Sequence, residues 1–112
     1  MLQETDLTLQ AASLGRHLED HKGQDVSVLD LRGKNNWTDF FIITTVSSKT
    51  HMDGIDKHLR EFCREHNIEI IGRSKSGKNM TDEWRIIDLG WVIVHLMTKQ
   101  SREFYELERL WR

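Results

Sequence analysis

The sequence predicts a single α/β domain over residues 1–112, with a mixed five-stranded sheet, flanking helices and the element order αββαβββα. Three observations support this prediction. Stretches with apolar residues at helical spacing alternate with short runs that are rich in β-branched and aromatic residues. The length of 112 residues is that of one compact domain. Finally, no proline and no linker rich in serine and glycine divides the chain.

The N-terminal half predicts a helix, two strands and a second helix. The apolar stripe of the first helix is formed by Leu7, Ala11, Leu14 and Leu18. Residues 25–31 and 39–46 predict strands, and the second run is apolar on both faces, which is typical of a central strand. Ser47 and Ser48 are candidate caps for a helix over residues 48–66. The stripe of that helix is formed by Met52, Ile55, Leu59 and Phe62, with Cys63 beside it.

The C-terminal half predicts three further strands and a last helix. A short strand at 68–71 follows the second helix, which would make that helix a parallel crossover connection. Strands at 83–89 and 91–97 are expected to meet at a tight turn near Gly90. A helix over residues 101–111 ends the chain. Its buried stripe is predicted to be Phe104, Leu107 and Trp111.

The composition excludes several classes of protein. With 38% hydrophobic residues the chain is too apolar to be disordered, and no run approaches the ~20 apolar residues of a membrane helix. The net charge of −2 argues against binding nucleic acid through the overall electrostatic field, so if the protein works near nucleic acid, a protein surface there is the expected partner. Acids near the N-terminus argue against a targeting signal, and Cys63 has no disulfide partner. We therefore expect a cytoplasmic protein.

Two motifs resemble chemical sites without completing them. Residues 72–78 have the spacing of a phosphate-binding loop, but Asn79 and a strand pattern follow where Ser or Thr and a helix are required. A solvated loop is expected instead. His17 and His21 have the i, i+4 spacing of two metal ligands, but no third ligand follows, which favours an ordinary solvated helix end. Cys63 is expected to be a buried, inert thiol. No catalytic residue, metal or cofactor is predicted.

The C-terminal hairpin predicts two different faces. With Leu89 and Gly90 as a two-residue turn, Asp88 would face Trp91 and Trp84 would face His95. The opposite, aliphatic face would lie under the helices and is formed by Ile87, Val92, Val94 and Leu96. Because Trp and Tyr are enriched at interface hot spots, the aromatic face is a candidate partner surface.

Tyr105 extends the same hypothesis to the last helix. At about 100° per residue it points nearly opposite the predicted buried stripe. Two alternatives stay open: Trp84 or Trp91 lies beneath a helix, or Tyr105 is a lone surface aromatic, which is a common occurrence.

The same residues carry a resemblance to a known family. The chain resembles the ribosomal silencing factors, the Iojap-like family, in four blocks that cover it nearly end to end. The blocks are residues 28–34 (VLDLRGK), 38–43 (TDFFII), 84–95 (WRIIDLGWVIVH) and 102–111 (REFYELERLW). The resemblance implies a nucleotidyltransferase-like fold without catalytic residues. Ser47-Ser48 stands where such enzymes carry Gly-Ser, and the chain has no Asp-x-Asp pair for magnesium.

The resemblance also implies a partner and a mechanism. Such a factor binds the large ribosomal subunit through its ribosomal protein fourteen, blocks joining of the subunits and represses translation when nutrients are scarce. Trp84, an exposed Leu89 and Tyr105 would carry the contact. The hairpin prediction adds further residues to the partner surface, namely Asp88, Trp91, His95 and Met97. Neighbouring ribosomal RNA and a homodimer of the free protein are further expectations.

One departure and two rival functions stay open at this point. Trp91 stands where the family usually has Asp, which indicates either an altered partner surface or local repacking. The rivals are a metal-dependent nucleotidyltransferase, which would need the missing Asp pair, and an RNA-binding module using the loop over residues 73–78.

Overall fold

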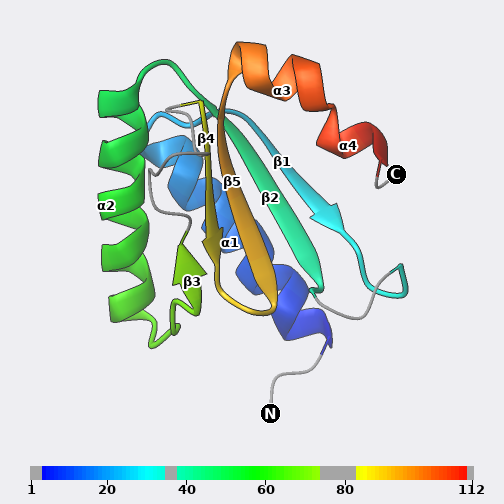
Figure 1. The fold of residues 1–112 in the computed structure, drawn as a ribbon. Coiled ribbons are helices and arrows are strands. Elements are labelled where there is room, and N and C mark those ends of the chain that lie inside the picture. Colours follow the sequence, from blue (N-terminus) through cyan, green and yellow to red (C-terminus); the bar gives the residue numbers. More distant parts are fainter. Residues whose placement is uncertain (1–3, 35–37, 74–82, 111–112) are drawn as a thin grey trace.

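The computed structural model describes residues 4–34, 38–73 and 83–110. Four strands of five to seven residues form a mixed sheet with helices on both faces (Figure 1). These strands are β1 (Gln24–Asp30), β2 (Phe40–Val46), β4 (Trp84–Asp88) and β5 (Val92–Thr98). A two-residue segment, β3 (Gly72–Arg73), extends the edge, giving the order β1-β2-β5-β4-β3. The predicted single α/β domain with a mixed sheet is confirmed.

The centre of the sheet is a parallel pair with antiparallel strands on either side. β2 runs parallel to β5, whereas β1 pairs antiparallel with β2 and β4 antiparallel with β5. All seven residues of β2 are buried, as expected for a central strand that is covered on both faces.

The predicted fifth full strand is the main error in the sheet. Residues 68–71 form no strand, and pairing begins only at Gly72, which lies opposite Asp88. Ile68 and Ile70 instead pack, partly buried, against the main core cluster. A short apolar run has too little periodicity to distinguish a strand from a connection that lines the core. The sheet therefore has four full strands and a minimal edge pair.

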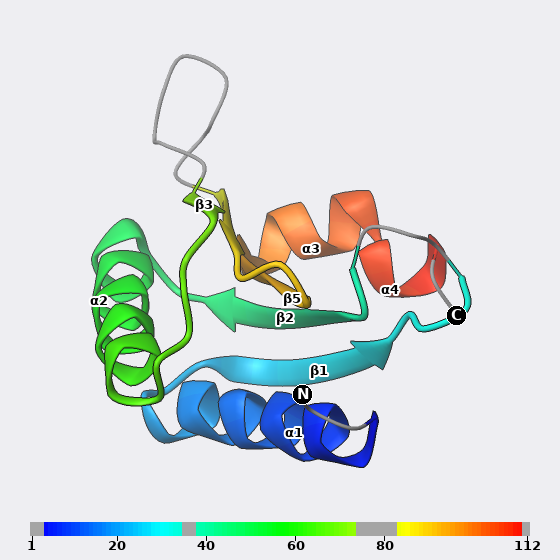
Figure 2. The ribbon, with the colours of Figure 1, turned by 90° about the horizontal axis from the view of Figure 1, so that it is seen from below.

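Two long helices cover one face of the sheet. In α1 (Glu4–Asp20) and α2 (Lys49–Glu65), the predicted stripes supply the core, with Leu14, Leu18, Met52, Ile55 and Leu59 almost fully buried. Ser48 caps α2, because its hydroxyl accepts the His51 N–H at 3.0 Å. Figure 2 shows α1 on one side of the sheet and the C-terminal helices on the other.

The β4–β5 turn lies one residue later than predicted. Gly90 and Trp91 are the central residues, since the Leu89 N–H donates to the Val92 carbonyl at 2.9 Å. Gly90 has φ +86°, and a glycine with positive φ at the first central position is typical of two-residue hairpin turns. The new register pairs Trp84 with Met97 and Asp88 with Ile93. The strand residues keep their predicted faces, because the alternation along each strand is unchanged.

The last predicted helix is divided into two. α3 (Lys99–Tyr105) is followed by its C-cap residue Glu106, which adopts a left-handed conformation, and then by α4 (Leu107–Leu110). The predicted buried stripe is wrong at Phe104, whose side chain is 78% exposed, while Leu107 is half-buried. Trp111 lies outside the described residues. The sheet-facing side of α3 is occupied by a charged residue, as described below.

Candidate functional site

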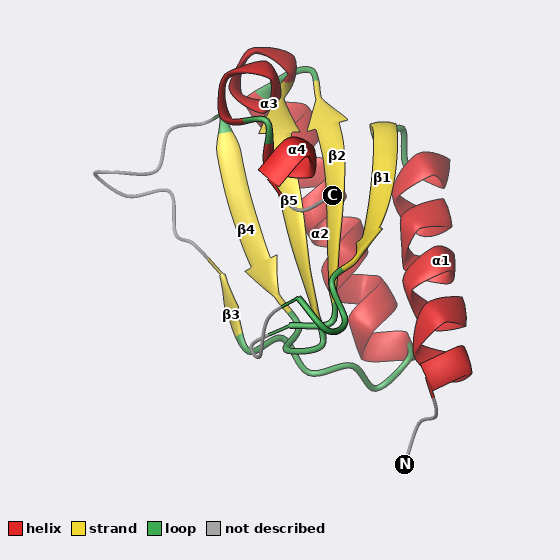
Figure 3. Cartoon of the chain, turned by 90° about the vertical axis from the view of Figure 1, so that its right-hand side faces the viewer, coloured by secondary structure: helices red, strands yellow, loops and turns green. Residues whose placement is uncertain are grey.

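Trp84 and Tyr105 form an aromatic pair at the surface. Their ring centroids lie 4.6 Å apart with the planes tilted by 47°. Trp84 opens β4 and is half-buried, whereas Tyr105 ends α3 and is 47% exposed. Figure 3 shows why they meet, since α3 crosses the end of the sheet at which β4 begins. Two residues that are 21 positions apart thus present one continuous aromatic surface.

His95 lies beneath this pair and supports it. The Trp84 indole N–H donates to Nδ1 of His95 at 3.1 Å, and the Phe41 ring packs edge-on against the imidazole at 4.5 Å. His95 is only 4% exposed, and burial lowers its pKa from 6.5 to about 4. The ring is therefore neutral at neutral pH. Because Nδ1 accepts a hydrogen bond, the proton lies on Nε2, which has no hydrogen-bond partner among the described residues.

The other residues predicted to contact a partner are less accessible. Met97 is fully buried, and Asp88 is half-buried with its carboxylate accepting the Gly90 N–H at 2.7 Å. The predicted exposure of Leu89 is wrong, because this side chain is 4% exposed and belongs to the main core cluster. Leu89 shares the strand face of Ile87, and that face lies under the helices.

Trp91 does not lie on the predicted aromatic face. The one-residue shift of the turn directs it to the main core cluster, where its ring meets Phe40 edge-on at 6.1 Å. Trp91 therefore packs, partly buried, against the core and does not join the aromatic face.

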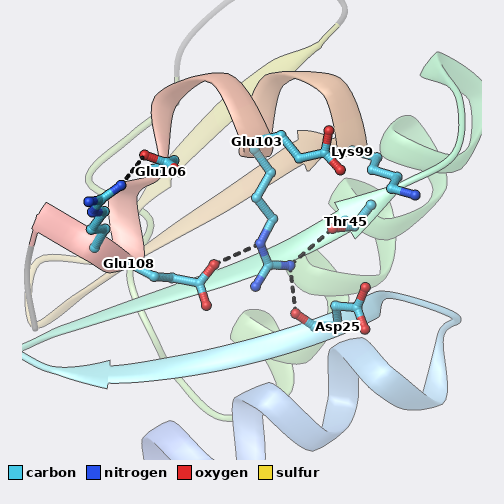
Figure 4. Close-up of a pocket in the computed structure, with 8 residues that line it drawn as sticks. Asp25, Thr45, Lys99, Glu103, Glu106 and Glu108 are labelled. Atoms are coloured by element: carbon cyan, nitrogen blue, oxygen red, sulfur yellow. Dashed lines mark hydrogen bonds and ion pairs between the residues drawn. The ribbon is translucent and has the colours of Figure 1, made fainter.

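Two residues beside the aromatic pair were not recognised in the sequence. The helical pattern predicts that Phe104 lies in the core, but its exposed ring contacts Tyr105 edge-on at 4.9 Å. Arg102 lines a pocket of about 530 Å³, together with residues of α3, α4 and the sheet; Figure 4 shows this pocket. No short-range pattern marks either residue, because their environments depend on how α3 is placed on the sheet.

Among the described residues, no cluster has the composition of a metal site. Over residues 4–34, 38–73 and 83–110, no three or more His, Cys, Asp or Glu residues gather in a way that could hold a metal. The expected buried thiol is confirmed, since burial raises the pKa of Cys63 to about 11. The loop over residues 74–82, with Lys75 and Lys78, lies outside the described residues, so its prediction stays untested.

The predicted solvated helix end at His17 and His21 is instead a helix–helix contact. The two imidazole rings lie 4.4 Å apart, and His21 stacks on His58 of α2 with the centroids at 4.0 Å. All three side chains are half-buried. Among the helices that the structure describes, none is long and apolar enough to cross a membrane.

Comparisons with known proteins agree on one family. The family model described as "Ribosomal silencing factor during starvation" matches residues 4–112. A ribosomal silencing factor of Haemophilus influenzae is 39% identical over 94 residues, which are 84% of this chain and 89% of that protein.

Two solved structures share the fold. A crystal structure of a Chromobacterium violaceum protein matches with a TM-score of 0.81 at 27% identity, covering 92% of this chain and 84% of that one. A Bacillus halodurans protein matches with a TM-score of 0.74 at 32% identity, covering 94% and 93%. Because the family model spans nearly the whole sequence, the chain belongs to the family of ribosomal silencing factors.

Proposed function

We propose that this protein silences ribosomes by binding the large ribosomal subunit through its ribosomal protein fourteen. The bound domain occupies the face that the small subunit needs, so it blocks subunit joining and represses translation under nutrient limitation. Family membership supports the general role. The single observation that supports the docking site is the Trp84–Tyr105 pair, whose rings are in contact and partly exposed in the described part of the domain.

The aromatic pair has the physical properties of an interface hot spot. Truncating a hot-spot Trp or Tyr weakens binding by ~1–4 kcal/mol, mainly through lost apolar burial. The Trp84 ring is already held by His95 and by Tyr105, so little side-chain entropy is lost on docking. A preformed pair of this kind favours a protein surface over a phosphate backbone.

The remaining predicted residues take supporting roles in this proposal. His95 and Met97 are buried rather than exposed to the partner, and His95 holds the Trp84 ring in place through its hydrogen bond. Leu89 anchors the end of the hairpin in the core, and Asp88 orders the turn through its bond to Gly90. Trp91 packs, partly buried, against the main core cluster. Of the residues predicted to contact the partner, only Trp84 and Tyr105 are then proposed to touch it directly, and the others keep these two in place.

Further features of the proposal follow from the family. The protein acts by steric occlusion and not as an enzyme, and the nucleotidyltransferase-like fold serves as a scaffold only. It works in the cytoplasm, contacts neighbouring ribosomal RNA at the rim of the interface, and forms a homodimer when free.

Subunit joining in vitro provides the direct test. Purified small and large subunits are mixed with the protein and separated on a sucrose gradient, and wild type is expected to reduce the joined fraction. Trp84→Ala and Tyr105→Ala should each relieve this inhibition. Leu9→Ala is the matched control, because Leu9 is a 63% exposed apolar residue of α1, on the other side of the sheet.

The outcomes separate the docking site from its rivals. Undiminished inhibition by both aromatic variants would falsify the site assignment. Binding to isolated ribosomal protein fourteen should persist at elevated salt, because the contact is largely apolar. A steep loss of binding with salt would instead support the rival RNA-binding function.

A further inference from the structure

The helix that carries Tyr105 is attached to the sheet by polar contacts rather than by an apolar face. In α3 only Ser101 is buried, and α4 buries none of its residues. A short helix normally stays on a sheet through an apolar stripe, because its own hydrogen bonds are too few to stabilise it. Among the described residues of α3 and α4, apolar contact with the sheet is therefore limited, and Leu107 is only half-buried.

The polar contacts form a clamp centred on Arg102, whose side chain is 14% exposed. Its Nε donates to Glu108 in α4 at 2.9 Å, and Nη1 donates to the Asp25 carbonyl at 2.6 Å and the Thr45 hydroxyl at 3.0 Å. Nη2 donates to the Ser27 hydroxyl at 3.2 Å. The acceptors Asp25 and Thr45 lie beside each other on β1 and β2, below α3 (Figure 4).

Ser27 closes the clamp. Its hydroxyl accepts from Arg102 and donates to the Glu108 carboxylate at 2.6 Å. One guanidinium thus joins α3, α4, β1 and β2 and uses four of its five N–H groups. Lysine, with a single nitrogen, cannot reproduce this geometry.

The clamp determines which side of α3 faces outward. Phe104 follows Arg102 by two residues and therefore lies about 200° around the helix. With Arg102 against the sheet, Phe104 is directed to solvent, where its ring contacts Tyr105, and Tyr105 in turn contacts Trp84. The three rings form a continuous aromatic row from α3 to β4.

We propose that Arg102 is a positioning residue of the docking surface, and that the clamp presents Phe104 to the partner beside Tyr105 and Trp84. The inference rests on the proposed function and deepens it. The occupant is the same protein surface of the large subunit, because the Phe104 ring continues the Trp84–Tyr105 pair without a gap. Glu103 and Glu106, which are neighbours of Phe104 and Tyr105 in the sequence, are exposed, and such carboxylates fit the polar rim of a protein interface.

The test measures the affinity for purified large ribosomal subunits, with the fold checked by circular dichroism and urea unfolding. Arg102→Gln is expected to weaken binding at least tenfold while the sheet stays folded, and Arg102→Lys should restore little. Phe104→Ala is expected to weaken binding about tenfold. Arg109→Gln is the matched control, because Arg109 is an exposed arginine of α4 that pairs only with Glu106 among the described residues.

A double-variant cycle distinguishes positioning from a merely structural role. If Arg102 acts by placing the aromatic row, Arg102→Gln combined with Tyr105→Ala should weaken binding by much less than the product of the single effects. A general loss of folded protein would instead multiply with the loss of the tyrosine. Independent, multiplicative effects would overturn the positioning role.

The remaining outcomes are decisive as well. If Arg102→Gln does not fold, Glu108→Gln replaces it, since that change leaves the bonds from Arg102 to β1 and β2 in place and is expected to weaken binding severalfold. Wild-type affinity of Glu108→Gln and Phe104→Ala, with Tyr105→Ala impaired, would overturn this inference and leave the proposed function intact. Wild-type affinity of all the aromatic variants would overturn both.

Discussion

The indole N–H of Trp84 donates a hydrogen bond to Nδ1 of His95, over 3.1 Å, from one strand of the hairpin to the next. The bond requires a neutral imidazole, because a protonated ring would carry a hydrogen on both nitrogens. The docking pair described above is therefore supported by a buried group that resists protonation, which makes its behaviour with pH predictable.

The free energy of unfolding should depend on His95 in mild acid. Burial lowers the pKa of His95 from 6.5 to about 4, so the unfolded chain binds the proton more readily than the folded one between these values. The contribution of neutral His95 to the free energy of unfolding is fully present above pH 6.5 and is lost as the pH falls towards 4. Between pH 7 and pH 5, the free energy of unfolding should fall by about 2 kcal/mol because of His95. Urea unfolding of His95→Phe at both pH values should lack this loss, whereas His66→Gln, an exposed histidine, should retain it.

The pKa of His17 should respond to its neighbours across the helix contact. It lies below 6.5 because of burial first and then the nearby His21 and His58, with Asp20 and Glu65 acting in the opposite direction. Replacing His21 by Gln removes a like charge, so the pKa of His17 should rise. An NMR titration of the imidazole carbon-bound protons measures the change. An unaltered or lower pKa of His17 in this variant would contradict the role assigned to His21.

Arg85 should be a major determinant of stability, because it ties β4 to α2. Its guanidinium contacts Asp56 at 3.0 Å and Asp53 at 2.8 Å, and Asp56 is buried. Arg85→Met removes a close cationic partner from the buried Asp56 carboxylate, whose contact with Arg60 is longer at 3.4 Å, so urea unfolding should show a loss of about 2–4 kcal/mol. Lys49→Met, which breaks an exposed pair with Asp53, should cost less than about 1 kcal/mol. Equal losses of stability in the two variants would argue against a special contribution from the buried ion pair between Arg85 and Asp56.

Two glycine-to-alanine changes should shift stability in opposite directions. A Cβ on Gly23 would lie 2.6 Å from the Thr44 hydroxyl and 2.8 Å from the Leu18 carbonyl, so Gly23→Ala should destabilise by about 1–3 kcal/mol. Gly54 lies within α2 with open space at its Cβ position, and Gly54→Ala should stabilise by about 0.4–1 kcal/mol. Thermal unfolding of the two variants beside wild type measures both signs. A stabilised Gly23→Ala variant would show that Thr44 and Leu18 leave enough room for a Cβ at position 23.

Much of the fold was predictable because it depends on local periodicity. The stripes at Leu14 and Leu59 identified the faces of two helices, and the alternation from Val92 to Leu96 identified the core face of a strand. Even the misplaced turn left these faces unchanged. The turn itself was ambiguous, because Gly90 can occupy either central position of a hairpin turn and only the pairing of Leu89 with Val92 decides between them.

By itself, the sequence determined the order of the main elements, the two faces of the hairpin and the aromatic character of Trp84 and Tyr105. Only the tertiary structure decided that Leu89 is buried and that Phe104 is exposed. The physical reason is the distance along the chain over which the deciding contacts act. Arg102 binds acceptors that lie 57 to 77 residues away in the sequence, and these bonds rather than the apolar spacing of the helix orient α3. A helical pattern predicts which residues lie on the same side of a helix. The contacts that the helix makes with the rest of the domain decide which side faces solvent.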